Sequence, residues 1–224
     1  MLRREQKLGR SLAATLALYA LAAPALMGQV GYPPDNSPFR DIRKGHSLTA
    51  VAGYFGGSGG RFGIGPHNGM VYGGRYDIRT GGTVQFGLSV SHGSLERFVV
   101  DSFVATTLRS GPVTQSVTFA DISVQFNITG GKSWHRLAPF IGAVVGLAFA
   151  SDTPQDITRY EFGNELYLAP TAGFRFFLSD RLHLKSEIRG VFWKLDYPAI
   201  AGNDFSEWIA SPWVHVGLGY SFSL

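Results

Sequence analysis

The sequence contains no cysteine and few charged residues. Without cysteine the chain can form no disulfide, no thiolate metal site and no lipid anchor on a cysteine. Charged residues make up 16% of the 224 residues, below the roughly 25% typical of soluble domains. The net charge of +4 predicts no basic surface for nucleic acid, because residues 1–28 carry three of those four net charges.

The sequence also lacks any run of 18 apolar residues beyond residue 30, which excludes a transmembrane helix there. The longest apolar segment lies earlier, SLAATLALYALAAPALM at 11–27, and follows the basic stretch MLRREQKLGR. This order, with small residues before Gly28, is typical of a cleaved secretory signal peptide. We expect residues 1–28 to be that signal peptide, with an uncleaved membrane anchor as the alternative, and residues 29–43 to be a short periplasmic linker.

What the sequence does contain is a series of segments in which apolar residues alternate with polar or small ones. The last of them, WVHVGLGYSFSL at 213–224, alternates along its whole length. A period of two predicts a β-strand with one apolar face, and about 9–11 residues suffice to cross a bilayer when the strand is tilted. We expect eight such strands, near 45–56, 68–79, 82–94, 117–129, 136–149, 165–179, 181–194 and 212–224.

The connections between these segments alternate between short and long. Glycine-rich or aspartate-containing turns join every second pair, whereas the connections near 57–67, 95–116, 150–164 and 195–211 are longer than ten residues. An even strand number with this alternation is typical of transmembrane barrels, which have short periplasmic turns and long extracellular loops. The sequence therefore predicts an all-β fold over residues 44–224, an eight-stranded antiparallel up-and-down transmembrane β-barrel. If 98–108 were a further spanning strand, a ten-stranded barrel would be the alternative.

Residues 44–224 resemble the small outer-membrane β-barrel proteins of bacteria, the OmpA-transmembrane and OmpX-like group. The resemblance rests on the strand pattern and on the final strand, where Tyr220 and Phe222 occupy alternate positions. Members of that group usually end in Phe, where this chain has Leu224. The resemblance implies location in the bacterial outer membrane, contact with its lipids and lipopolysaccharide, and insertion by the barrel-assembly machinery, which reads the C-terminal strand.

The polar face of several strands carries charged residues that a barrel would turn into its lumen. The expected lumen charge network consists of Arg75, Asp77, Asp121, Arg175, Lys185, Glu187 and Arg189. Because an unpaired charge in a narrow lumen costs several kcal/mol, positive and negative side chains should interleave. We therefore predict a polar plug of ion pairs and a structural or surface-interaction role. A narrow pore for small ions or solutes is the alternative.

Aromatic residues near the strand ends fit the two interfacial girdles of a transmembrane barrel. The girdle is expected to comprise Tyr76, Phe86, Phe126, Phe176, Phe192, Trp213, Tyr220 and Phe222. Recognition of a surface ligand, if the protein has one, is expected at the loops 95–116 and 195–211, which are rich in apolar and aromatic residues.

One short stretch, SHGSLE at 91–96, invites a catalytic interpretation. His92 and Ser94 fall on the same strand face, with Glu96 beyond, and resemble the outward-facing triad of the lipid A deacylases. The match covers only two fixed residues, so we predict that the protein is not an enzyme, with a lipid A-modifying enzyme as a second alternative. The six histidines have no metal-ligand spacing, and no metal or cofactor is expected.

Overall fold

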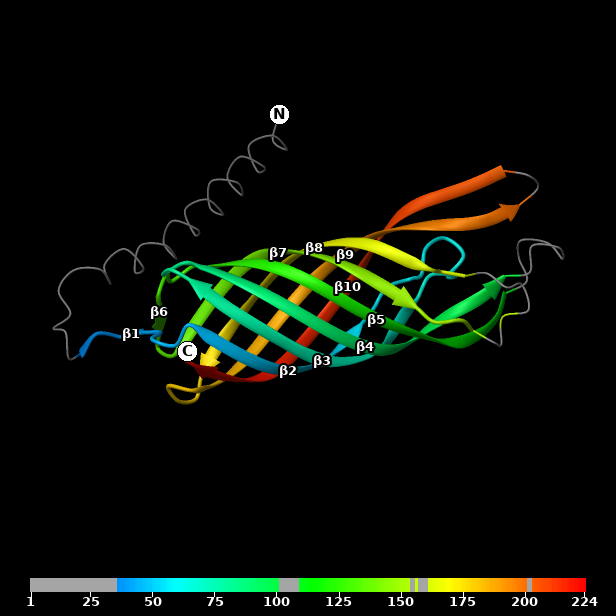
Figure 1. Cartoon of the computed structure of the whole chain (residues 1–224). Coiled ribbons are helices and arrows are strands. Elements are labelled where there is room, and N and C mark those ends of the chain that lie inside the picture. The colour runs from blue at the N-terminus through cyan, green and yellow to red at the C-terminus, as the bar shows by residue number, and fades with distance from the viewer. Residues whose placement is uncertain (1–35, 101–108, 154–155, 157–160, 201–202) are drawn as a thin grey trace, which may run out of the picture. The chain divides into compact units, whose positions relative to one another are not determined.

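The computed structural model describes residues 36–100, 109–153, 156, 161–200 and 203–224. This part of the chain is built from antiparallel strands (Figure 1). It contains no helix long and apolar enough to span a membrane. The predicted signal peptide, residues 1–28, and the first part of the predicted linker lie outside the described residues.

Eight long strands form a closed ring in which each strand pairs antiparallel with its neighbours along the chain. They are β2 (His46–Phe55), β3 (His67–Thr80), β4 (Val84–Val100), β5 (Arg109–Asn127), β7 (Leu137–Ala150), β8 (Asn164–Phe177), β9 (Leu182–Ile200) and β10 (Asn203–Phe222). The ring closes between the last strand and the first, in an unbroken register from Trp213↔Phe55 to Phe222↔His46. The predicted eight-stranded antiparallel barrel is confirmed.

Two three-residue strands lie outside this ring, β1 (Phe39–Asp41) and β6 (Lys132–Trp134). β1 pairs with β6, which in turn pairs with the start of β7. Both lie at the end of the barrel that carries the short turns and the C-terminus, here called the turn end (Figure 1). The ten-stranded barrel is therefore wrong, and part of the predicted linker is paired strand.

The opposite end, here called the loop end, differs from the prediction in two of its four connections. Residues 56–66 and 151–163 are connecting segments, as expected. By contrast, most of 95–116 belongs to β4 and β5, and most of 195–211 belongs to β9 and β10. β9 and β10 run on as a projecting hairpin (Figure 1) because they stay paired as far as Asn203↔Ile200, with a register shift between Asn203 and Phe205.

Side chains alternate along every ring strand between an apolar outer face and a buried inner face. Leu88, Ile122, Ile188 and Val216 are each more than half exposed on the outer face. Their inward neighbours on the same strands, such as Ser89, Asp121 and Glu187, are buried. A continuous exposed apolar belt around a polar interior is the arrangement of a barrel surrounded by lipid.

The aromatic residues expected in the girdles lie on the outer face, with one exception. Phe86, Phe126, Phe176, Phe192 and Tyr220 are exposed, and Tyr76 and Phe222 are half-exposed. Trp213 is only 1% exposed and points into the barrel. Its assignment to the girdle was wrong because Trp213 shares the inward parity of His215, so its position near a strand end does not place it at the membrane interface.

Candidate functional site in the barrel interior

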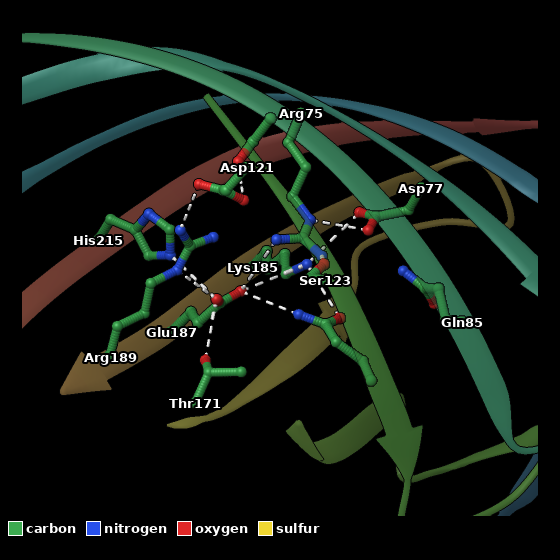
Figure 2. A network of polar contacts seen from close by, with 12 residues as sticks. Arg75, Asp77, Gln85, Asp121, Ser123, Thr171, Lys185, Glu187, Arg189 and His215 are labelled. Atoms are coloured by element: carbon green, nitrogen blue, oxygen red, sulfur yellow. Dashed lines mark hydrogen bonds and ion pairs between the residues drawn. The ribbon is translucent and has the colours of Figure 1, made fainter. Parts of the chain in front are cut away.

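The centre of the barrel interior holds an ion network arranged around Glu187 of β9 (Figure 2). Its Oε1 accepts hydrogen bonds from Arg189 Nε at 2.7 Å and from Thr171 Oγ1 at 2.9 Å. Its Oε2 accepts a hydrogen bond from Gln125 Nε2 at 3.1 Å and lies 3.5 Å from Lys185 Nζ. The strict alternation of β9 puts Lys185, Glu187 and Arg189 on the inner face, which is why they meet here.

Two further carboxylates complete this lumen ion network. Asp77 lies 2.7 Å from Arg75 Nε and 3.4 Å from Lys185 Nζ. Asp121 lies 2.9 Å from Arg189 Nη1. Six of the seven charged residues expected in the lumen are thus joined in one network, whose side chains are at most 2% exposed. A buried charge of this kind is tolerated because it is both paired and hydrogen-bonded.

The seventh residue, Arg175 of β8, lies apart from the carboxylates, closer to the turn end. Its guanidinium donates to the side-chain oxygens of Gln85 and Asn127. It also lies 5.9 Å from the ring centre of Phe140. No ion pair joins Arg175 to a carboxylate within the described residues. The interior is therefore neutralised around Glu187 and carries an excess positive charge towards the turn end.

A second layer, made of aromatic rings, fills the interior between the ion network and the loop end. We call it the aromatic plug, and it comprises Phe55, Phe119, Phe162, Tyr167, Trp193 and Trp213, all buried. The ring centres of Phe119 and Trp213 are 5.0 Å apart, and those of Phe55 and Trp193 are 5.3 Å apart. Rings at these separations pack favourably in tilted and edge-on arrangements. The interior thus contains two different kinds of packing in series, a layer of ion pairs and a layer of aromatic rings.

The two layers are in direct contact. The Tyr167 hydroxyl donates to Asp121 Oδ2 at 2.8 Å, and the guanidinium of Arg189 lies 4.9 Å from the ring centre of Trp213. Sequence reasoning missed the aromatic plug, although its signal was present. Trp193 continues the inward parity of Glu187 and Arg189, and Phe119 continues that of Asp121. The alternation that predicts inward charges on these strands also predicts these inward aromatic rings.

A buried ion pair ties one connecting segment to the barrel wall at the loop end. Arg97 Nη2 of β4 lies 2.7 Å from Asp156 Oδ2, and both side chains are almost fully buried. Arg97 Nε also donates to Gln115 Oε1 of β5 at 2.8 Å. No sequence signal predicted this pair, because Asp156 lies in a connection with no periodicity. The pair holds Asp156 against β4 at the loop end.

The other connecting segment, 56–66, is held against the projecting hairpin. The backbone N–H of Arg61 donates to the Tyr197 hydroxyl at 3.0 Å and to Glu207 Oε1 at 2.7 Å. Ile64 of this segment is buried in the apolar core. The hydrogen bond from the Tyr197 hydroxyl is the main reason that the pKa of Glu207 lies below its ordinary value. Gly60 has a φ of +80°, which glycine adopts without strain.

The residues considered for catalysis point away from the interior and do not meet. His92 and Ser94 both lie on the exposed outer face of β4. His92 Nδ1 lies 3.0 Å from Thr118 Oγ1 of β5, and within the described residues no hydrogen bond joins His92 to Ser94. The structure thus gives Ser94 no general base at this position. No three histidine, aspartate or glutamate side chains of the described ranges cluster as metal ligands.

The ion network predicts a large loss of stability when its central carboxylate is removed. Glu187→Ala leaves Arg189, Lys185 and Arg75 buried without their shared partner, and breaking a buried pair costs about 3–5 kcal/mol. We expect that decrease in the free energy of unfolding, measured by urea denaturation of the barrel refolded into lipid vesicles. Lys194→Ala on the same strand removes an exposed ion pair and is the matched control. Equal effects of the two substitutions would contradict the role assigned to Glu187.

Comparison with known proteins finds solved structures of similar fold but no match by sequence. No protein-family model and no curated protein sequence matches the chain. Among solved structures, the outer membrane protein OprG from Pseudomonas aeruginosa superposes with a TM-score of 0.54 at 13% identity, over 84% of this chain and 100% of that one.

Two further solved structures are similar to this chain in fold. Neisserial surface protein A superposes with a TM-score of 0.51 at 14% identity, over 83% of this chain and 98% of the other. Outer membrane protein AlkL, determined in lipid bilayers, superposes with a TM-score of 0.50 at 18% identity, over 87% of this chain and 96% of the other. At these identities the likeness concerns the fold alone. The chain has the fold of the small outer-membrane β-barrel proteins.

Proposed function

We propose that this protein is a bacterial outer-membrane β-barrel with a closed lumen, whose role is structural or lies in interactions at the cell surface. The observation that carries the proposal is the filling of the interior. The aromatic plug and the lumen ion network occupy successive levels of the barrel, and the side chains of both are buried. The exposed apolar belt and the fold shared with OprG and AlkL support a location in the outer membrane.

The projecting β9–β10 hairpin is the surface that we assign to external contacts. Trp208 is 64% exposed on its outer side and pairs in register with Lys194 of β9. A cation beside an exposed aromatic ring suits the phosphate-bearing surface of lipopolysaccharide. This hairpin replaces the loop 195–211 as the candidate contact surface, whereas residues 101–108 of the other candidate loop lie outside the described residues. Membrane lipids and the barrel-assembly machinery are the other partners that we propose.

The closed lumen predicts the electrical behaviour of the protein in a planar lipid bilayer. We expect no steady conductance from the wild type, because buried ion pairs and aromatic rings occupy successive levels of the interior. A narrow pore would instead give conductance steps whose ion selectivity changes in Glu187→Gln, at the centre of the ion network, and stays the same in the control Lys194→Gln. Such steps would contradict the closed lumen and establish the pore.

The proposed orientation predicts which positions can be reached from outside the cell. Because the chain has no cysteine, a single introduced cysteine is a unique label site. Ser206→Cys on the hairpin should react in intact cells with a polymer-linked maleimide too large to cross the outer membrane. Asp180→Cys, in the turn between β8 and β9, should react only after the membrane is opened. Reaction of Asp180→Cys in intact cells, or of neither variant in a membrane fraction, would contradict the proposal.

A further inference from the structure

A polar pocket of about 440 Å³ lies at the turn end, where the chain enters the barrel. One of its walls is the segment 40–44, which includes the end of β1, and the other walls come from the turns around 133–136 and 177–180 and from the end of β10. Figure 1 shows β1 and β6 together at this end. The pocket is separate from the lumen ion network and plays no part in the function proposed above.

The wall formed by residues 40–44 is fixed in place by hydrogen bonds to three different elements. Ile42 donates its N–H to the carbonyl of Gly131 at 2.9 Å. Ser133 Oγ donates to the carbonyl of Arg40 at 3.4 Å. Arg79 Nη2 donates to the carbonyl of Lys44 at 3.0 Å. The backbone of the segment therefore forms a defined wall of the pocket.

The charge of this pocket is strongly positive. Four cationic residues line it, Arg40, Arg43, Lys44 and Arg136, against the two carboxylates of Asp41 and Asp180. Asp41 is already 4.0 Å from Lys132 Nζ. Within the described residues, none of the four lining cations forms an ion pair. A concave surface with an excess of one sign of charge concentrates the opposite ion.

A layer of buried polar side chains lies directly beneath the pocket, and it too is rich in donors. It contains Gln85, Asn127, Arg175 and His183, which are buried, and Arg79, which is half-buried. Five buried nitrogens of this layer have no hydrogen-bond partner within the described residues: Arg79 Nη1, Gln85 Nε2, Asn127 Nδ2, Arg175 Nε and His183 Nε2. Arg175 is 4% exposed and bonds only neutral oxygens. Buried polar groups are ordinarily hydrogen-bonded, and a layer with more donors than acceptors makes this end of the interior favourable to a nearby anion.

Direct contacts connect the pocket with this donor layer. Ser221, which lines the pocket, lies with its Oγ 3.2 Å from His183 Nδ1. Phe177, another lining residue, has its ring centre 5.5 Å from that of His183. Ser221 and Phe177 therefore join the pocket to the donor layer, and the excess positive charge of Arg175 adds to that of the pocket walls.

We propose that this turn-end pocket binds an oxyanion of the phosphate class. Guanidinium groups match phosphate oxygens in geometry and charge, and Arg40, Arg43 and Arg136 bring three of them to the pocket lining. That the bound group lies in the periplasm rests on the function proposed above, whereas binding itself does not. The phosphate has two available sources, a soluble phosphorylated compound or the headgroup of a phospholipid in the surrounding leaflet.

Isothermal titration calorimetry with inorganic pyrophosphate, on the barrel refolded in a non-ionic detergent, tests binding of a soluble anion. We expect saturable binding by the wild type that weakens as salt is added. The double variant Arg43→Gln/Lys44→Gln should bind at least about tenfold more weakly, because two charged donors are lost. Both side chains are outside the ring, so the barrel should fold. Arg181→Gln is the matched control, since Arg181 lies at the same end but does not line the pocket.

Phosphorus NMR on lipid nanodiscs that contain phosphatidylglycerol tests the headgroup source. A headgroup signal perturbed by the wild type and by Arg181→Gln, but not by the double variant, would assign the phosphate to lipid. Pyrophosphate binding in detergent would assign it to a soluble compound. Absence of both effects, or equal losses in the double variant and the control, would overturn the proposal. Neither measurement depends on cellular location, so failure here is distinct from failure of the cysteine labelling.

Discussion

The rest of the structure depends on one constraint, the closure of the backbone hydrogen-bond ring between β2 and β10. A strand edge in hydrocarbon would leave N–H and C=O groups without partners, at a cost of several kcal/mol for each group. The unbroken pairing of ten residues from Trp213↔Phe55 to Phe222↔His46 removes that edge. Once the ring is closed, the period of two in each strand assigns every side chain to lipid or to the interior. The apolar belt and the buried charges are two consequences of the same geometry.

Eight strands leave an interior that side chains can fill. In this chain an ion network and a cluster of aromatic rings occupy it. Around Glu187 the ion network satisfies charges that could not be buried singly. Towards the loop end, Trp193, Trp213 and their neighbours form a core like that of a soluble domain. The contacts of Arg189 with Trp213 and of Tyr167 with Asp121 join the two layers. Towards the turn end the charges no longer balance, and Arg175 is left among neutral partners beneath a cationic pocket.

The sequence determines much of this arrangement because parity is a local property. The outward Leu184 and inward Lys185 of β9 could be assigned from alternation alone, as could the inward position of every charge in the ion network. Non-local contacts could not be assigned in this way. The stretch 195–211 contains prolines and glycine and is predicted to be a loop, yet most of it belongs to β9 and β10, whose Tyr197 and Glu207 accept hydrogen bonds from the segment 56–66. The ion pair between Asp156 and Arg97 forms only in the folded barrel. The same holds for the pairing of residues 39–41 with β6. Trp213 lies near a strand end, which predicts a place in the girdle, but its parity is inward and the parity decides its position.

The most direct test of a closed, fully paired ring is the electrophoretic mobility of the protein extracted from the outer-membrane fraction, unboiled against boiled, in SDS. A closed transmembrane barrel resists SDS until it is heated, because none of its strands has a free edge. The account predicts that the unboiled protein migrates differently from the boiled one. It also predicts that Val216→Pro, which removes a ladder hydrogen bond from the closing strand, abolishes the difference. Identical mobility of unboiled and boiled wild-type protein would contradict the closed barrel and every assignment of an inner and an outer face that depends on it.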